Sequence, residues 1–296
     1  MQKLLIVGCG DIARRLLPRL LGHYRIFALL RDPEQCAFWR DQGARPVLAD
    51  LDQPHSLQRI AGLADIVVHL APPPSVDRVP GVHHDSRTRA LLAALVRGRS
   101  LPQRIVYIST SGVYGDCRGA RIDETRGVRP ATARACRRVD AERRLRALGR
   151  RGVVVSILRA PGIYAADRLP IDRLQRGIPA LRETDDVYSN HIHADDLALL
   201  TCAALRYGRS NRTYNVTDDS EIRMGEYFDL VADGFGLPRV PRLSRHGAER
   251  QLSHLQLSFM SESRRLLNQR VKKEFRAQLC YPRVEDGIAA ARTERE

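Results

Sequence analysis

Two glycines and an alanine near the N-terminus have the spacing of a phosphate-binding turn, in the stretch Gly8-Cys9-Gly10-Asp11-Ile12-Ala13. The stretch follows the apolar run KLLIV and precedes leucines at helical spacing, so a strand should enter the turn and a helix should leave it. Gly8 then allows the tight turn, Gly10 lets the backbone approach a pyrophosphate, and Ala13 lets the helix pack on the strand. Because free N–H groups at a helix start hold phosphate, Gly8, Gly10, Asp11, Ile12 and Ala13 are predicted to bind a dinucleotide. The alternative is a glycine turn that binds no ligand.

The end of the second expected strand bears on which dinucleotide is bound. In NAD-preferring proteins an acidic residue about 20 positions beyond the glycines accepts the ribose 2′-hydroxyl. Arg31 stands there, and a guanidinium favours the 2′-phosphate of NADP. Asp32 beside it keeps NAD open as an alternative, and a solvated Arg31–Asp32 pair is the reading without a ligand. At the end of the third expected strand, Asp50 and Leu51 should border the adenine.

Short apolar runs alternate with helical patterns along the first 160 residues. This alternation predicts an α/β protein with a Rossmann-type, doubly wound parallel sheet that has helices on both faces. The expected strands are KLLIV, RIFALL, ARPVLA, ADIVVHLA, RIVYIS and VVVSIL, and the expected helices span 11–22, 54–63, 85–97, 131–149, 194–206 and 224–235. After residue 160, proline, loop and short-helix signals increase. We therefore expect a dinucleotide-binding domain of 1–160, completed by 187–218, and a small C-terminal substrate lobe of 161–186 and 219–296.

The composition limits the classes of partner. The chain has 49 lysines and arginines against 34 acidic residues, a formal charge of +15. The arginines are spread along the whole chain, with no basic patch interleaved with aromatics, so we do not expect a nucleic-acid partner. No apolar run approaches the about 18 residues of a membrane span, and the N-terminal run is too short for a signal sequence, so we expect a cytoplasmic protein without a membrane contact. Six scattered cysteines form no CxxC pair and predict neither a zinc site nor a disulfide framework.

Further segments follow the glycine loop in a specific order between residues 49 and 219. They are ADLD (49–52), DIVVHLA (65–71), YISTSGVYGD (107–116), LRAPGIY (158–164), NHIHADD (190–196) and YNVTDD (214–219). With the loop at 8–13, they resemble the extended short-chain dehydrogenase/reductase family of NAD-dependent epimerases and dehydratases. The segments 261–270 and 280–288 look like the end of the same family's substrate lobe.

The resemblance implies roles for individual positions. Thr110, three residues before the Val-Tyr-Gly, matches the catalytic hydroxyl of the family. Asn190 and His193 match a segment that helps to order the substrate lobe; His191 and His193 could suggest a metal, but with no third ligand evident no metal site is predicted. Leu70, Ala71 and Pro72 would line the ribose side of the cofactor. Ser109 would lie beneath its nicotinamide, and Pro161 and Ile163 would meet its carboxamide.

The helix after the fifth strand departs from the family pattern. Members carry Tyr-x-x-x-Lys there, with a glutamate four residues beyond the lysine, and counting back from Glu142 puts Arg138 at the lysine and Arg134 at the tyrosine. Both arginines share a helix face with an apolar stripe, so we expect them to be buried, whereas Arg137 belongs to another face. A solvated charged helix is the alternative. The chain is therefore identified as an atypical member.

This replacement changes the chemistry that the site can perform. Tyrosine, with a pKa of about 10, can exchange a proton when a nearby ammonium lowers it, whereas arginine, above about 12, stays protonated. Arg138 can still donate to the nicotinamide ribose, and Arg134 can hold an acidic substrate or polarise a carbonyl group. The proton would then come from Thr110, a water or Tyr114, unless Tyr114 is only a packed aromatic.

Two functions agree with these patterns. The first is an NAD(P)-dependent oxidoreductase or epimerase-like enzyme for an anionic or nucleotide-sugar-like small molecule, with NADP as the expected cofactor and NAD as the alternative. The second is a non-catalytic regulatory protein that senses NADP(H). The resemblance also allows a homodimer formed through two helices per subunit.

Overall fold

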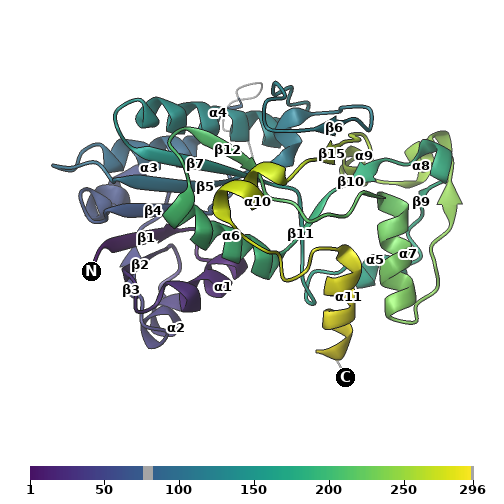
Figure 1. The fold of residues 1–296 in the computed structure, drawn as a ribbon, viewed down its shortest axis with the longest axis horizontal. Helices are drawn as coiled ribbons and strands as arrows, with labels where there is room; N and C mark the ends of the chain where they lie inside the picture. The colour runs from purple at the N-terminus through teal and green to yellow at the C-terminus, as the bar shows by residue number, and fades with distance from the viewer. Residues whose placement is uncertain (76–82, 295–296) are drawn as a thin grey trace.

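Seven parallel strands form the main sheet (Figure 1). The computed structural model of the 296-residue chain describes residues 1–75 and 83–294. Across the sheet the strands are β3 (Arg45–Leu48), β2 (Arg25–Leu30), β1 (Lys3–Val7), β4 (Ile66–His69), β5 (Arg104–Thr110), β7 (Val154–Ala160) and β12 (Arg212–Asn215). The predicted α/β class with a parallel sheet is confirmed. All six expected strands form, and 212–215 supplies a seventh.

Helices cover both faces of this sheet, which explains why its strands read as continuous apolar runs. One face carries α1 (Asp11–Leu20), α2 (Gln35–Asp41), α6 (Ala194–Tyr207) and α10 (Gln269–Phe275), whose apolar side chains share one buried cluster with the strands. The other face carries the 3₁₀ helix η1 (Pro54–Ile60), α3 (Ser86–Leu95) and α4 (Ala133–Gly149). The chain moves outward in one direction from β1 to β3 and in the other from β4 to β12. Ligands of such sheets bind where this order reverses, outside the carboxyl ends of the strands.

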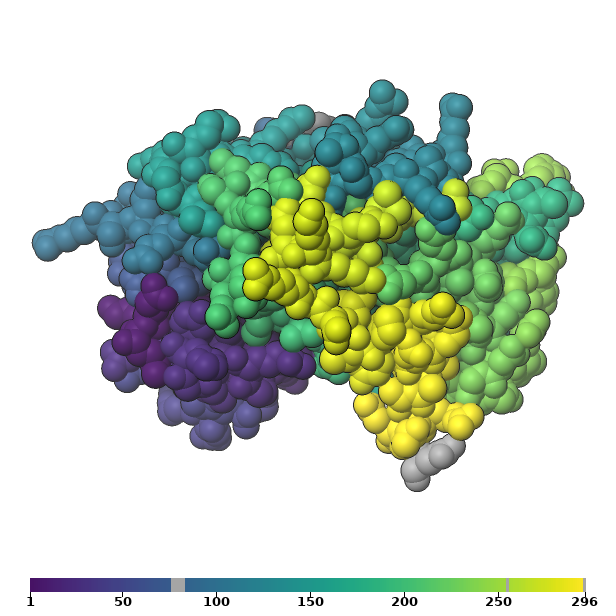
Figure 2. Space-filling view, in the orientation of Figure 1, coloured from purple at the N-terminus to yellow at the C-terminus, as the bar shows by residue number. Residues whose placement is uncertain are grey.

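A third buried cluster lies beside the sheet and uses side chains from residues 164–291. Its helices are α5 (Ile171–Gln175), α7 (Met224–Gly234), α8 (Arg245–Gln251), α9 (His254–Phe259) and α11 (Val284–Thr293). Four pairs of short strands lie outside the main sheet: β8 (Gly162–Tyr164) with β11 (His191–His193), β10 (Tyr188–Ser189) with β13 (Ile222–Arg223), β9 (Ala180–Leu181) with β14 (Arg242–Leu243), and β6 (Arg121–Ile122) with β15 (Arg265–Leu266). The remaining elements are the 3₁₀ helices η2 (Ser111–Tyr114) and η3 (Glu183–Asp185). Figure 2 shows the C-terminal segment, in yellow, crossing this face of the molecule from above the sheet toward α11.

The structure differs from the expected elements in two respects. The helix expected at 54–63 is a shorter 3₁₀ helix at 54–60, where Ser56 Oγ donates to the carbonyl of Gln53 (2.7 Å) and the segment stays tightly wound. The short-helix signals after residue 160 gave no bounds for α5 and α8, and α2 was not expected, because one or two turns carry too few residues for a helical period to stand out.

The described residues contain no helix that combines the length and the apolar character needed to cross a membrane. All six cysteines are free thiols, and Cys280 is exposed while Cys117 is buried.

Candidate functional site

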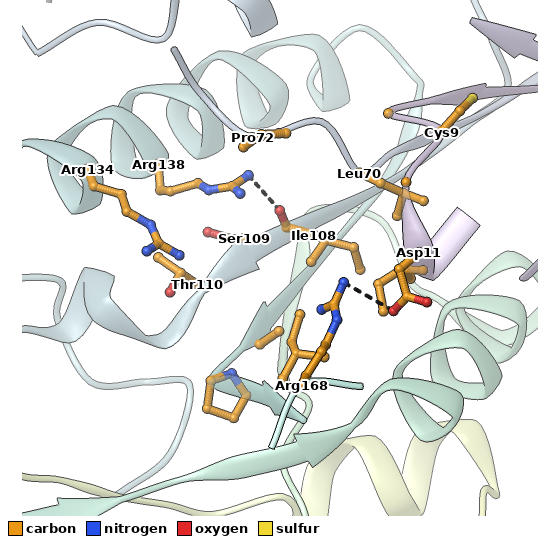
Figure 3. A pocket seen from close by; sticks show the side chains of 16 residues that line it. Cys9, Asp11, Leu70, Pro72, Ile108, Ser109, Thr110, Arg134, Arg138 and Arg168 are labelled. Atoms are coloured by element: carbon orange, nitrogen blue, oxygen red, sulfur yellow. Dashed lines mark hydrogen bonds and ion pairs between the residues drawn. The ribbon is translucent and has the colours of Figure 1, made fainter. Parts of the chain in front are cut away.

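A cavity of about 300 Å³ opens where the carboxyl ends of β1, β4, β5 and β7 meet the starts of α1 and α4 (Figure 3). It adjoins the reversal point of the sheet, as expected for a ligand site in this fold. Its lining is drawn from five segments of the main sheet and its helices (8–12, 70–72, 108–110, 134–138 and 160–161), from β8 and from the loop after β8. The lining residues are Gly8, Cys9, Gly10, Asp11, Ile12, Leu70, Pro72, Ile108, Ser109, Thr110, Arg134, Arg138, Ala160, Pro161, Ile163 and Arg168.

The glycine loop has the shape that a pyrophosphate needs. Gly8 has φ +98°, and a Cβ there would lie 2.4 Å from the backbone nitrogen of Ala71, so only glycine fits. A Cβ on Gly10 would meet nothing within 4 Å, so the backbone is open to a ligand. Gly10 directly precedes α1, and its position gives the helix no side-chain cap among the described residues. The N–H groups at the helix start are therefore free to bind a ligand. Ala13 lies outside the lining and is fully buried in the cluster between helix and sheet.

A second cavity of about 290 Å³ lies on the other side of the glycine loop. It shares Gly8, Cys9 and Pro72 with the first cavity, so the two form one path past the loop. Besides the shared Gly8 and Pro72, four of the expected cofactor positions line it: Arg31, Asp50, Leu51 and Ala71. A dinucleotide that follows this path would place its adenosine half in the second cavity and its nicotinamide half in the first.

Arg31 and Asp32 have different surroundings in the second cavity. The Asp32 carboxylate accepts a hydrogen bond from the backbone N–H of Glu34 (3.0 Å) and so stabilises the turn before α2. Arg31 is exposed and makes no ion pair within residues 1–75 and 83–294. Arg87, which sequence reasoning missed, also lines this cavity and forms an ion pair with Asp52 (2.6 Å). Arg31 and Arg87 are the two cations that line the second cavity among the described residues.

The two arginines of α4 both reach the first cavity, in different ways. Arg138 is buried, and its Nη1 donates to the carbonyl of Ile108 (2.8 Å) and to the hydroxyl of Tyr107 (3.0 Å). Arg134 is exposed, which corrects the expectation that both would be buried, because it is the second residue of α4 and lies at the rim. Two effects lower the pKa of Arg134: the larger is partial desolvation by the surrounding protein, and the smaller is repulsion by the charge of Arg138. Arg137, expected on another face, is buried as well.

Thr110, at the end of β5, and Tyr114, at the end of η2, differ in their access to the cavity. Thr110 lines the cavity, and its Oγ1 accepts from the backbone N–H of Gly112 (3.3 Å), so its proton is available to a ligand. Tyr114 is fully buried outside the lining, and its hydroxyl donates to Oδ1 of Asn215 (2.7 Å). This contact agrees with the packed-aromatic alternative for Tyr114.

Beneath the cavity a buried ion pair connects α4 to β5 and β7. Glu142 is 1% exposed and accepts two hydrogen bonds from Arg159, at 3.0 and 2.7 Å, and one from the hydroxyl of Ser109 (2.7 Å). Burial alone would raise the pKa of Glu142, but the Arg159 contacts outweigh it and lower the pKa, so the carboxylate stays charged. Arg159 in turn lies over the ring of Tyr114, 4.6 Å from its centroid. The pair thus fixes the strand end that carries Ser109.

Asn190, directly before β11, ties that strand to β15 and to the residue that precedes it. Nδ2 of Asn190 donates to the carbonyl of Arg264 (2.9 Å), and its Oδ1 accepts from the N–H of Leu266 (2.8 Å). The His193 ring accepts from the N–H of Asp195 (3.3 Å) at the start of α6. In the described part of the chain, no group of three or more His, Cys, Asp or Glu side chains is placed to hold a metal.

His69 lies at the end of β4 and is expected to stay neutral. Burial and then the charge of Arg138 lower the pKa of His69 to about 3, from 6.5. Below pH 6.5 the folded protein therefore binds fewer protons than the unfolded chain. The free energy of unfolding is highest with respect to His69 above pH 6.5 and decreases as the pH falls toward 3. At pH 5 the loss should be about 2 kcal/mol by the conversion of pKa into free energy.

Urea unfolding at pH 7 and pH 5 measures this effect against a His69→Gln variant, whose amide can still bond the hydroxyl of Thr88 (2.9 Å from the ring in the native protein). The variant should lose less stability between the two pH values than the native protein. An NMR titration that puts the His69 pKa near its ordinary value would contradict the prediction.

Sequence reasoning missed Arg168, Cys9, Ile108 and Ala160 in the lining of the first cavity. Ile108 and Ala160 adjoin predicted positions and could have been found as neighbours of Ser109 and Pro161. Arg168 lies in the irregular loop between β8 and α5, where no period or motif marks it. Burial raises the pKa of the Cys9 thiol to about 12, so this thiol stays protonated.

Comparison with known proteins agrees with this geometry. Residues 4–217 match the model of the NAD dependent epimerase/dehydratase family, so the chain belongs to that family. A curated relative is a 4-hydroxy-2-methyl-3-oxo-4-farnesyl-3,4-dihydroquinoline-1-oxide ketoreductase of Stigmatella aurantiaca, 23% identical over 78% of this chain and 72% of that protein. The family and the fold support an oxidoreductase- or epimerase-like role.

Solved structures extend the likeness over the whole chain. A functionally unknown conserved protein from Silicibacter pomeroyi has a TM-score of 0.79 and 28% identity, with 100% of both chains covered. A dTDP-glucose 4,6-dehydratase from Streptomyces venezuelae, in a structure with bound NAD, has a TM-score of 0.77 and 21% identity over 99% of this chain and 96% of that one. The second likeness shows the fold alone.

Proposed function

We propose that the protein is an NADP(H)-dependent oxidoreductase or epimerase-like enzyme that acts on an anionic or nucleotide-sugar-like small molecule. One observation carries the proposal: a single cavity joins the glycine loop to Thr110 and to the guanidinium groups of Arg134 and Arg138. These arginines occupy the helix positions that the Tyr-x-x-x-Lys pattern assigns to the proton donor and its lysine partner.

The residues present fit a bound dinucleotide. Gly8, Gly10, Asp11 and Ile12 would hold its pyrophosphate at the start of α1, and Arg31 would bind the 2′-phosphate of NADP. Leu70, Pro72, Ser109, Pro161 and Ile163 would enclose the nicotinamide half, while Ala71, Asp50 and Leu51 would border the adenosine half. When bound, the nicotinamide supplies hydride transfer.

The arginines would stabilise charge, because neither can exchange a proton near neutral pH. Arg138 is anchored to the end of β5 and would donate to the nicotinamide ribose. Arg134 is at the rim and would hold the anionic group of the substrate or polarise its carbonyl oxygen. Thr110, directly or through a water, would then pass the proton that accompanies hydride transfer.

We further propose that the substrate contacts a lobe made of 161–186 and 219–296, while 1–160, completed by 187–218, form the dinucleotide-binding domain, with Pro161 and Ile163 of the lobe beside the nicotinamide half. The separate buried cluster at residues 164–291 supports this division. So does the cavity itself, because the loop after β8 contributes Arg168 to its lining.

Substrate binding by Arg134 predicts a specific kinetic change. In a panel of sugars, carbonyl compounds and hydroxy acids followed by reduced-nicotinamide absorbance, Arg134→Ala should raise KM for anionic substrates by about tenfold or more, because a charge-assisted contact is lost. Uncharged substrates should be affected little. Arg143→Ala is the matched control, since Arg143 is an exposed arginine of α4 outside the cavity lining. An equal KM change for charged and uncharged substrates would refute the assignment.

A non-catalytic NADP(H) sensor is the second candidate. It is favoured by the cavity lining, which contains no tyrosine, lysine or histidine among the described residues. Dinucleotide binding without turnover of any compound in the panel would favour the sensor, and turnover would exclude it.

A further inference from the structure

Arg168 reaches across the cavity from the loop between β8 and α5 to the start of α1. Its Nη2 lies 3.1 Å from Oδ2 of Asp11, the first residue of α1 (Figure 3). Arg168 also shares the cavity lining with Gly8, Gly10 and Ile12. The side chain is 35% exposed, so the ion pair leaves part of the guanidinium accessible to a ligand.

Asp11 is held in place from its other side. Arg15 Nε donates to Asp11 Oδ1 (2.9 Å), and Arg15 Nη1 donates to Asp195 Oδ1 (2.8 Å) in the first turn of α6. Because Oδ1 accepts from Arg15, the remaining oxygen of Asp11, Oδ2, is the one that forms the ion pair with Arg168. A salt-bridged row therefore runs from α6 through α1 to the loop after β8.

A carboxylate at this position is unfavourable for a pyrophosphate unless a cation offsets it. Asp11 adjoins the free N–H groups of α1, where the phosphates would bind, and two like charges at close range repel. Of the three arginines in the described lining, Arg134 and Arg138 belong to α4, whereas Arg168 contacts Asp11 itself. Arg168 is thus the lining cation placed to offset Asp11.

We propose that Arg168 binds the pyrophosphate of the dinucleotide and that Asp11 orients its guanidinium for this contact. This inference rests on the proposed dinucleotide-binding function. It adds a pair of residues that position the ligand, Asp11 in the sheet domain and Arg168 in the lobe. A guanidinium has five N–H donors in a planar fork, so it can keep Asp11 as one partner and donate to a phosphate oxygen with the others.

The arrangement has a consequence for the lobe. Since the pyrophosphate would add a second acceptor for Arg168, the bound dinucleotide would hold the loop after β8 against α1. Dinucleotide binding should therefore order the substrate side of the cavity before substrate enters, and the bound form should protect residues 165–170 from hydrogen exchange.

Binding measurements on the purified full chain test the proposal without turnover. NADH, NADPH and ADP-ribose are titrated into the native protein and into Arg168→Ala, with thermal unfolding as the check that both are folded. We expect Arg168→Ala to weaken all three ligands by about ten- to hundredfold, as for a lost charge-assisted hydrogen bond, and to make binding less sensitive to salt. Arg176→Ala is the matched control, an exposed arginine of the same lobe outside the lining, and should bind as the native protein does.

The variant Asp11→Asn tests whether Asp11 orients the guanidinium of Arg168 or only repels the ligand by its charge. In the Arg168→Ala background it should restore part of the lost affinity, because the uncompensated carboxylate is gone. In the native background it should not improve binding, because Arg168 loses its orienting partner. If Asp11→Asn strengthens binding equally in both backgrounds, Asp11 only repels the ligand and the orienting role is wrong.

The outcomes distinguish this inference from the proposed function. A native protein that binds none of the three ligands would refute the dinucleotide site itself. Native binding that Arg168→Ala leaves unchanged would refute only the role of Arg168. A loss confined to NADPH would place the contact at the 2′-phosphate and also overturn the inference.

Discussion

Arg31→Ala is expected to weaken NADPH binding by about ten- to hundredfold while changing NADH binding by less than about threefold. Only NADPH offers a 2′-phosphate, and the side chain of Arg31 lies in the second cavity without an ion pair in the described ranges. Asp32 forms no ion pair with Arg31 among the described residues, and its carboxylate instead accepts the backbone N–H of Glu34. Fluorescence titration of both reduced dinucleotides gives the ratio directly.

A charge-swapped variant sharpens this experiment. Arg31→Asp should reverse the preference, since a carboxylate there accepts the ribose 2′-hydroxyl and repels the 2′-phosphate. Arg14→Ala is a control on the same face of the protein, because Arg14 lies over the ring of Phe38 outside both cavity linings. An equal loss of NADH and NADPH on Arg31→Ala would show that Arg31 does not read the phosphate.

The sequence predicted the sheet well because its strands are buried on both faces. Strands such as β1 and β4 are continuous apolar runs, and a glycine that must take a positive φ follows β1 directly. Those signals lie within short stretches of sequence, so they can be recognised without knowledge of the tertiary structure. The cavity positions next to strand ends, such as Ser109 and Pro161, came instead from the family resemblance, and both line the cavity.

The parts that sequence could not supply depend on contacts between distant segments. Arg168 and Asp11 are far apart in the chain and meet only because the loop after β8 folds back over α1. Likewise, helical period places Arg134 and Arg138 on one face but does not show that Arg134 lies at the rim. A helix face is buried only where another element covers it, and one sequence does not disclose that cover.

The arginines near the site fall into two groups with different physical roles. Arg159 is buried and paired with a buried carboxylate, so its charge is neutralised inside the protein. Arg134 and Arg168 are partly exposed at the cavity, where their charge can act on a ligand. An arginine-rich sequence alone does not separate these groups, because the pairing partner of Arg159 is on another element, α4.

Glu142→Gln is expected to lower the free energy of unfolding by about 3–5 kcal/mol, because it leaves a buried guanidinium without its counter-charge. Glu142 and Arg159 are 1% and 4% exposed and approach to 2.7 Å. The amide keeps the size of the side chain, so the loss comes from charge rather than from packing. Urea unfolding followed by circular dichroism measures it.

Two further variants show whether the buried pair itself is responsible. Arg146→Met removes a partner of the same carboxylate that is 30% exposed, and this loss should cost about 1 kcal/mol or less. The double variant Glu142→Leu with Arg159→Met removes both buried charges and should recover most of the stability lost by Glu142→Gln. It should nevertheless bind dinucleotide more weakly than the native protein, because Ser109 loses the carboxylate that fixes its hydroxyl at the end of β5. A double variant as unstable as Glu142→Gln would mean that packing around these side chains, and not their charges, supports the floor of the cavity.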